Sequence, residues 1–338
     1  MGVNRWAHGG ARWSIVSFAW LTCIACVQAG PMATSGQFEV SPSGAATYTL
    51  PIPVPPGTGG IEPKLALSYN SQSGNGLLGV GWSLSGLSAI GRCPQTLAQD
   101  NVRGSINYDA NDRYCLDGQR LILVSGTYGA DGAEYRTERE SFSRIISYGT
   151  AGNGPASFKV WTKAGQLLEY GNTADSRIEA VKVTGSVATW PAGTVRVWAL
   201  NKLSDTKGNY LTVTYTEDAT NGDFTPSRID YTGNAGAGLT PNNSVLFVYE
   251  TRTDAIAAYV AGSMIKPIKR LKTIQSQQAG VLTHELRLAF DNLGAVGTSR
   301  LTSVEQCDGA ATCMPKVTFE WQSGSDGTVG AKVKSGDG

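Results

Sequence analysis

The chain has 338 residues, of which 41% are hydrophobic and 16% are charged, so it can bury a core and is too apolar for intrinsic disorder. Its formal net charge of +1 argues against the strongly basic surfaces that bind nucleic acid or anionic membranes. The 42 glycines, among many Thr, Val and Tyr residues, predict short strands joined by tight turns.

The first thirty residues predict a secretory signal peptide. Arg5 and Arg12 precede an apolar run from Trp13 to Val27, which is too short to span a bilayer comfortably. The small side chains that end this region match a signal-peptidase site, so we expect cleavage between Ala29 and Gly30. The mature chain is therefore expected to be exported, and to be secreted, periplasmic or held at the cell surface.

A lipoprotein is the alternative interpretation of this leader. Cys26 would carry the lipid, but Cys23 occupies a position where that motif requires a large aliphatic residue. No later stretch is long and apolar enough to predict an integral membrane segment after cleavage.

Four cysteines remain in the mature chain: Cys93, Cys115, Cys307 and Cys313. An even number in an exported protein favours disulfides. Of the three possible pairings we favour Cys93–Cys115 with Cys307–Cys313, because each of these bonds closes a local loop. A four-cysteine zinc site is the rival interpretation, but both spacings are wider than the C-x₂-C pairs of such sites.

The beginning of the mature chain, residues 31–63, is rich in proline and glycine. Within it, Ala45 to Val54 predicts an edge strand, since proline cannot donate to a central ladder. Pro55 to Gly60 is a loop by composition, and Lys64 to Tyr69 alternates as a strand.

The remaining sequence predicts strands to its end. In Tyr210–Thr216, apolar residues alternate with threonines, as in half-buried antiparallel strands. Asp254–Val260 is the one plausible helix, and it is short. The clearest strand candidates are Arg120–Val124, Phe158–Thr162, Val195–Leu200, Tyr210–Thr216, Ser244–Glu250, His284–Phe290 and Lys316–Trp321.

These patterns predict an all-β fold, with many short antiparallel strands in large sheets, a sandwich- or shell-like arrangement and very little helix. We divide the chain into a signal peptide (1–29), one β-rich module (30–323) and a flexible, linker-like tail (324–338), because the tail is rich in Gly, Ser and Asp.

A glycine-rich stretch around Trp82 matches the dinucleotide fingerprint by letters, as Gly74-x-Gly76-x-x-Gly79. That fingerprint requires a helix amino terminus to receive the pyrophosphate, and a strand and turn follow here instead. We therefore predict that Trp82 is a buried structural anchor, with Gly79 and Gly81 leaving room for the backbone.

Metal and catalytic motifs are absent from the sequence. Asp109 and Asn111 begin an apparent calcium loop, but Arg113 occupies its fifth position, where an oxygen ligand is required. His284 is the only histidine of the predicted mature chain, and it shares a strand face with Leu286. Without G-x-S-x-G or H-E-x-x-H patterns, we predict no catalytic, cofactor-binding or metal-binding residues.

Several motifs spread over residues 35–321 together resemble the amino-terminal module of the Salmonella virulence plasmid B protein family, which includes B components of insecticidal toxin complexes and Rhs/YD-repeat relatives. The motifs are Gly36–Tyr48, Ile52–Gly57, Pro63–Asn70, Gly79–Gly86, Ile90–Cys93, Asp112–Leu121, Tyr135–Glu138, Trp198–Leu200, Asp205–Asn209, Arg228–Asn234 and Cys307.

The resemblance implies a β-rich, non-catalytic structural module of a secreted virulence or toxin-delivery protein, which helps to form a shell around or with another polypeptide. The expected partner is a downstream Rhs or toxin-complex polypeptide or toxin subunits, without nucleic acid and without a cofactor. A carbohydrate-binding adhesin that uses Trp161, Trp190 and Trp198 is the alternative. A hydrolase is a third possibility and would require acids around His284.

Overall fold

Antiparallel strands make up nearly all the regular structure that the computed structural model describes, namely residues 36–182, 190–292 and 297–321. This confirms the all-β prediction. The predicted signal peptide, with Cys23 and Cys26, and the predicted tail from Gly324 lie outside the described residues.

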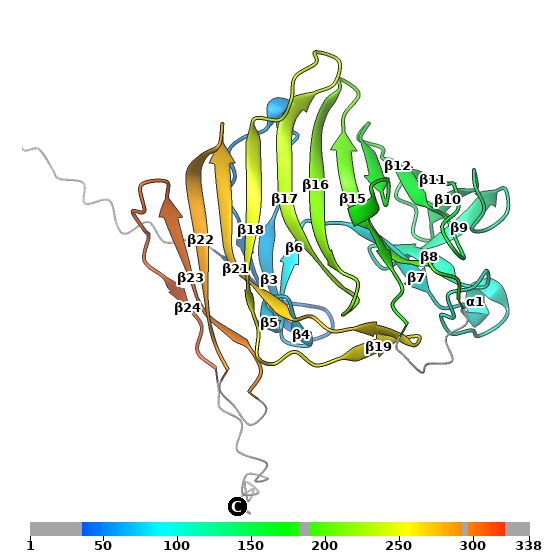
Figure 1. Ribbon diagram of the computed structural model, residues 1–338, viewed down its shortest axis with the longest axis horizontal. Coiled ribbons are helices and arrows are strands. Elements are labelled where there is room, and N and C mark those ends of the chain that lie inside the picture. Colours follow the sequence, from blue (N-terminus) through cyan, green and yellow to red (C-terminus); the bar gives the residue numbers. More distant parts are fainter. Residues whose placement is uncertain (1–35, 183–189, 293–296, 322–338) are drawn as a thin grey trace, which may run out of the picture. The chain divides into compact units, whose positions relative to one another are not determined.

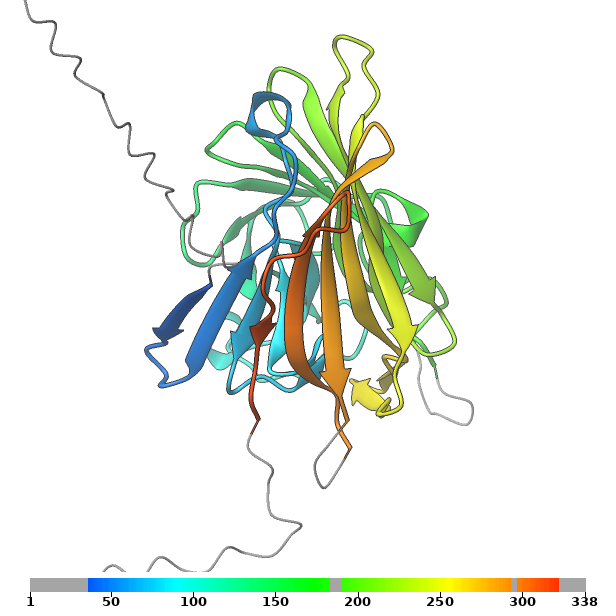
Figure 2. The same cartoon turned by 90° about the vertical axis from the view of Figure 1, so that its left-hand side faces the viewer.

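A small four-stranded sheet comes first in the chain, in the order β1-β2-β3-β6. It lies behind a much longer sheet in Figure 1, and Figure 2 shows the two as separate layers. Its strands are β1 (Gln37–Val40), β2 (Ala46–Pro51), β3 (Ala66–Asn70) and β6 (Trp82–Ser85).

Eight strands of the larger sheet close into a ring. Strands β7 to β13 pair in succession, and β15 pairs with both β7 and β13, which joins the two ends. The ring strands are β7 (Ala89–Cys93), β8 (Arg113–Leu116), β9 (Gln119–Ser125), β10 (Glu134–Thr137), β11 (Arg144–Tyr148), β12 (Ser157–Trp161), β13 (Leu167–Tyr170) and β15 (Val195–Ser204). A further strand, β14 (Arg177–Glu179), also pairs with β15.

From β15 the sheet continues as an open antiparallel extension, in the order β16-β17-β18-β21-β22-β23-β24 (Figure 1). Its strands are β16 (Asn209–Asp218), β17 (Asp223–Asn234), β18 (Asn243–Thr251), β21 (Lys269–Gln278), β22 (Val281–Asp291), β23 (Arg300–Asp308) and β24 (Val317–Thr318).

Two apolar cores follow from this arrangement. One fills the space between the small sheet and the open extension, where Leu67 and Trp82 meet Ile229 and Val245. The other consists of side chains from the ring strands, and Trp198 lies at its centre with ring contacts to Tyr114 and Phe158. In both cores alternate residues of each strand point inward, as the period of two predicts.

The few remaining elements are short. Hairpins are formed by β4 (Asn75–Gly76) with β5 (Gly79–Val80), and by β19 (Ala258–Val260) with β20 (Ser263–Ile265). The helical segments are η1 (Thr58–Gly60), α1 (Leu97–Asp100) and η2 (Ala174–Ser176). Among the described residues no helix is long and apolar enough to cross a bilayer.

The helix predicted at Asp254–Val260 is wrong. Asp254 is held at the start of this segment by a buried ion pair with Arg252, and β19 then pairs with β20 through a turn at Gly262. A glycine with φ near 83° supports this turn. Pairing with β20 therefore outweighs the helix propensity of the alanines.

The predicted edge position of Ala45–Val54 is also wrong, because β2 pairs with β1 on one side and β3 on the other. The first proline of the stretch, Pro51, is the last residue of β2, so the residues of β2 before it keep their backbone N–H groups for pairing. The true edge strand, β1, is not among the predicted strands.

Candidate functional site

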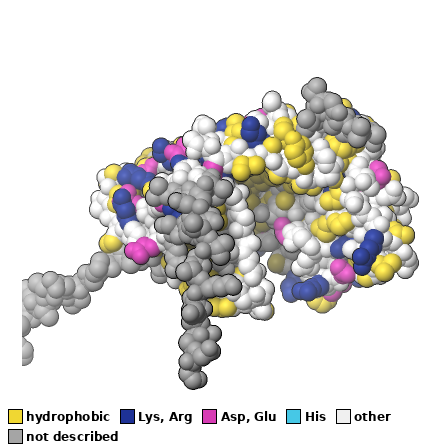
Figure 3. Space-filling model, turned by 90° about the horizontal axis from the view of Figure 1, so that it is seen from below, with side chains coloured by type: hydrophobic (Ala, Val, Ile, Leu, Met, Phe, Trp, Pro, Cys, Tyr) yellow, Lys and Arg dark blue, Asp and Glu magenta, His cyan; other side chains and the backbone are white. Residues whose placement is uncertain are grey.

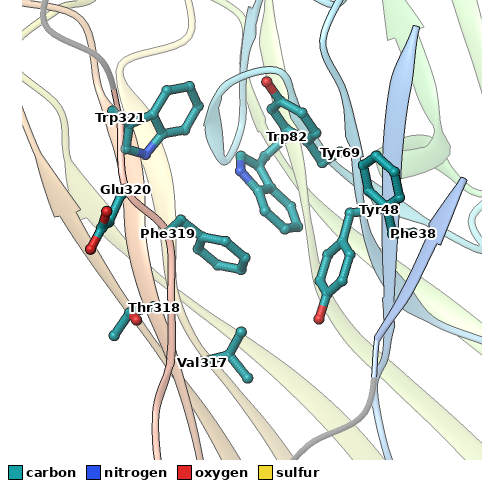
Figure 4. A pocket seen from close by; sticks show the side chains of 9 residues that line it. All are labelled: Phe38, Tyr48, Tyr69, Trp82, Val317, Thr318, Phe319, Glu320 and Trp321. Carbon is teal, nitrogen blue, oxygen red and sulfur yellow. The ribbon is translucent and has the colours of Figure 1, made fainter. Parts of the chain in front are cut away.

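An aromatic groove opens between the small sheet and the end of the open extension (Figure 4). It has a volume of about 440 Å³. One wall and the floor come from β1, β2, β3 and β6, and the other wall comes from β24 and the residues after it. The groove is lined by Phe38, Tyr48, Tyr69, Trp82, Val317, Thr318, Phe319, Glu320 and Trp321.

Trp82 forms the buried centre of the aromatic groove, and 3% of it is exposed. Its ring centroid lies 4.7 Å from that of Phe319 on one wall and 5.4 Å from that of Tyr69 on the floor. The indole therefore joins the two layers. That Trp82 anchors the fold stays a prediction.

The two glycines beside Trp82 allow this close approach. Gly79 and Gly81 have φ of 85° and 77°, a region that favours glycine. A Cβ at Gly79 would collide with the carbonyl oxygen of Ser299, and one at Gly81 would collide with the ring of Tyr69. Both positions therefore require glycine, because of their positive φ and because a Cβ would not fit.

One side of the aromatic groove is open. The residues just after β24 face β2 and β3, as the contacts Tyr48–Phe319 and Tyr69–Trp321 show. The outermost strand, β1, has no such partner opposite it among the described residues. Phe38 lines the groove, and 66% of it is exposed. The long sheet thus ends one strand short of covering β1.

Among the described residues, the backbone of β24 is paired on one side only. Val317 and Thr318 lie opposite Val304 and Ser303 of β23, and the Phe319 N–H donates to the Thr302 carbonyl. Because successive residues of a strand direct their N–H groups to opposite sides, those of Thr318 and Glu320 point toward the open side.

Only Trp82 among these lining residues was predicted as a site residue. The alternation of Val317, Phe319 and Trp321 along one strand was visible in the sequence, but their proximity to Phe38 and Tyr48 depends on tertiary folding. Side chains almost 280 residues apart in the chain meet here only because the small sheet packs against the sheet's far end.

The four described cysteines form two disulfides, Cys93–Cys115 and Cys307–Cys313, which are the pairs predicted from the sequence. The first joins β7 to β8, and the second closes the turn after β23. Glu305 lies near Cys307 and Cys313, but sulfur atoms joined in a disulfide are not available as thiolate ligands. This cluster therefore does not make a metal site.

We expect non-reducing peptide mapping of the exported protein to recover these two linkages. In a loop-entropy description, each linkage stabilises the fold by about 2–4 kcal/mol. Recovery of four free thiols, or of Cys93 bonded to Cys307, would contradict the assignment.

His284 lies in a cross-strand row with Ser276 of β21 and Asp308 of β23. The hydroxyl of Ser276 donates to the Pro53 carbonyl instead, and the Asp308 carboxylate accepts two backbone N–H groups of the following turn. The Nδ1 atom of His284 is buried, and none of the described residues forms a hydrogen bond with it. The row therefore lacks the hydrogen bonds of a nucleophile–base–acid site.

The tryptophans of the adhesin alternative do not form an exposed sugar platform. Trp198 is fully buried and donates from Nε1 to the Pro155 carbonyl, and Trp190 is buried against Tyr108. Of the three, only Trp161 is partly exposed. Stacking on a sugar requires an exposed aromatic face, so Trp190 and Trp198 are core residues.

Two other glycine- or oxygen-rich motifs are turns. The Gly74–Gly79 segment folds into the β4–β5 hairpin with no helix after it. The Asp109 carboxylate accepts the Asn111 backbone N–H in a local turn. Arg113 forms an ion pair with Asp100.

An acidic cleft of about 240 Å³ lies beside the β16–β17 turn, lined in part by Glu179 and Glu217. The Glu217 side chain still reaches solvent, but its pKa is raised to about 7. Partial desolvation is the largest cause, and repulsion from the carboxylates of Glu179 and Asp175 adds to it. Burial also raises the pKa of Asp223 in the same cleft.

We expect Glu217→Gln to stabilise the protein at pH 8 but not at pH 4.5. A carboxyl with a raised pKa binds its proton more tightly in the folded state, so the wild type loses stability as the pH rises from about 4.5 to about 7. Because the group is partly exposed and screened, the rise in Tm should be about 1–2 °C. Scanning calorimetry at both pH values tests this, with the exposed Glu39→Gln as control; an equal shift at both values would contradict it.

A second apolar surface lies at the β19–β20 hairpin. Ile256 and Tyr259 are exposed there, and the hairpin is fastened by a hydrogen bond from the Tyr108 hydroxyl to the Val260 carbonyl. Seen from below in Figure 3, hydrophobic side chains lie around a hollow in this face of the molecule. Exposed apolar clusters of this kind are typical of interaction surfaces.

Comparison with known proteins gives consistent results for sequence and fold. The sequence model of the family described as Salmonella virulence plasmid 65kDa B protein matches residues 40–235. The mono(ADP-ribosyl)transferase SpvB of Salmonella choleraesuis (strain SC-B67) is 28% identical over 173 residues, which is 45% of this chain and 28% of that protein. The chain therefore spans little more than a quarter of the length of this curated relative.

Two solved structures share the fold. The crystal structure of TcdB2-TccC3 has a TM-score of 0.67 and 18% identity, covering 87% of this chain and 17% of the other. The N-terminal domain of effector protein SpvB from Salmonella typhimurium strain LT2 has a TM-score of 0.61 and 19% identity, covering 77% of this chain and 98% of that domain.

Proposed function

Because the chain belongs to the Salmonella virulence plasmid 65kDa B protein family, we propose that it is a non-catalytic assembly module of a secreted virulence or toxin-delivery protein. In this role it helps to form a shell around or with another polypeptide. The proposed partner is a downstream Rhs or toxin-complex polypeptide, or toxin subunits.

The open side of the aromatic groove is the observation that carries this proposal. A sheet that ends beside an exposed Phe38 and unpaired edge amides is a template for another chain. Soluble proteins usually guard such edges with charges, prolines or covering segments. Addition of a polypeptide there would bury the aromatic side chains and pair the edge.

The toxin-complex fold supports the same function. Most of this chain, 87% of its length, shares the fold of part of the TcdB2-TccC3 structure, whose name joins two components. The proposal transfers to this chain only the general role of a wall or docking element.

A catalytic role is less well supported. The transferase activity in the name of the Salmonella relative belongs to a protein of which this chain spans 28%. The likeness to a solved SpvB N-terminal domain covers 98% of that domain, which supports the chain's equivalence to this part of the relative. Within the described ranges, the row at His284 lacks the hydrogen bonds that would activate Ser276.

Co-expression with the polypeptide of the neighbouring reading frame tests the proposal. We expect the two to elute together in size-exclusion chromatography, at a volume smaller than that of either alone. The proposal fails if the protein remains a monomer, and turnover of a substrate that His284→Ala abolishes would support the hydrolase alternative in its place.

A further inference from the structure

We propose that the open side of the aromatic groove binds one extended strand of the partner polypeptide, added to β24 beneath β1, with apolar residues facing the groove and basic residues facing outward. This inference rests on the proposed function, because it names the surface and the type of segment through which assembly would occur.

The place for this strand is defined by the layers on either side. Among the described residues, the small sheet ends at β1 and the long sheet ends at β24, and the residues just after β24 lie opposite β2 and β3. Phe38 and Val40 of β1 are each 66% exposed, and in a strand both point to the same side. One more strand beside β24 would cover both side chains and complete the sandwich.

Backbone hydrogen bonds would hold the added strand alongside β24. The Thr318 and Glu320 N–H groups point toward the open side, since Phe319 donates to β23. The backbone carbonyl oxygens of a bound strand would accept hydrogen bonds from these two N–H groups, as they do where other peptides extend the edge of a sheet. Since β1 is four residues long, a segment of about four to six residues would suffice.

The negative charge at the edge of the long sheet favours basic residues on the outward face of the added strand. Glu320 alternates with Phe319 and Trp321, so its carboxylate points away from the groove, as Figure 4 shows. Lys316, the basic residue of the same wall, lies 3.7 Å from Glu305 and is thus already paired. A lysine or arginine across from Glu320 would form a favourable cross-strand pair.

A defined peptide tests the site directly. The probe is a synthetic peptide, Lys-Val-Thr-Val-Lys-Val-Thr, with its ends blocked. The readout is the intrinsic tryptophan fluorescence of the protein during titration, to which Trp82 and Trp321 in the groove contribute. We expect saturable binding. A peptide with glutamates in place of the lysines should bind about tenfold more weakly, and a scrambled peptide should not bind measurably.

Variants at the groove distinguish pairing at the sheet edge from nonspecific hydrophobic binding of the peptide. Thr318→Pro removes an edge donor without removing a described ladder bond, and Phe38→Ser removes an exposed apolar contact; each should weaken binding at least about tenfold. Phe142→Ser is the matched control, since Phe142 is 70% exposed but lies in the loop between the ring strands β10 and β11. Glu320→Lys should reverse the preference between the lysine and glutamate peptides.

The outcomes separate this inference from the proposed function. Absence of peptide binding to the wild type, or equal binding to Phe38→Ser and Phe142→Ser, overturns the groove as the docking site. If the co-expressed complex forms and survives Phe38→Ser with Thr318→Pro, assembly is real but uses another surface, and the inference is wrong. If the peptide binds as expected but no complex forms, the strand site stands and the proposed assembly function fails.

Discussion

Replacing Trp82 with alanine should lower the free energy of unfolding by about 3–5 kcal/mol, the usual cost of truncating a fully packed aromatic residue. Trp82 contacts Phe319 across the interface between layers and Tyr69 within its own sheet. Truncation would therefore leave a cavity at the junction of the two sheets. Denaturant unfolding of the purified protein measures the loss.

Trp161→Ala is the matched control for this substitution. Trp161 lies on the ring strand β12, is partly exposed, and holds Arg144 over its ring at 5.6 Å. We expect this truncation to cost about 1 kcal/mol or less. Equal losses for Trp82→Ala and Trp161→Ala would show that Trp82 does not anchor the two layers.

Arg92→Met should destabilise the protein by a similar amount, about 3–5 kcal/mol, because it leaves a buried carboxylate without its cation. Arg92 is buried in the ring core, where it donates to Asp112 at 2.9 Å and from Nε to the Val195 carbonyl at 2.7 Å. Its guanidinium also lies 5.6 Å from the ring centroids of Tyr108 and Trp198.

The double variant Arg92→Met with Asp112→Asn tests the cause. If an unpaired charge explains the loss, removing the carboxylate should restore much of the stability, since replacing a whole buried pair is often close to neutral. Denaturant unfolding of both variants measures this. If the double variant is no more stable than Arg92→Met, the loss comes instead from the ring contacts of Arg92 and from its hydrogen bond to the Val195 carbonyl.

Strands with one buried face were predictable from the sequence. In β16, Leu211, Val213 and Tyr215 are all buried, as their alternation with threonines indicates. In such strands, the burial of every second residue leaves a direct trace in the sequence. The strand β1 leaves no such trace, because all four of its residues are exposed.

Other features depend on contacts between distant parts of the chain. Asp254 accepts two hydrogen bonds from Ser299, 45 residues away, and this contact holds the start of the segment that was predicted to be helical. Ring closure likewise depends on the pairing of β13 with β15, and no local pattern encodes it. Trp82 was identified from its glycine neighbours, but the groove around it required the packing of two sheets.

Hydrogen exchange of the protein alone and in its co-expressed complex tests the central claim most directly, because it reports whether the open sheet edge becomes paired. We predict slower exchange at Thr318 and Glu320 in the complex, with residues 37–40 also protected and the ring strands unchanged. Unchanged exchange at Thr318 and Glu320 in a complex that forms, or failure to form any complex, would contradict assembly through this edge.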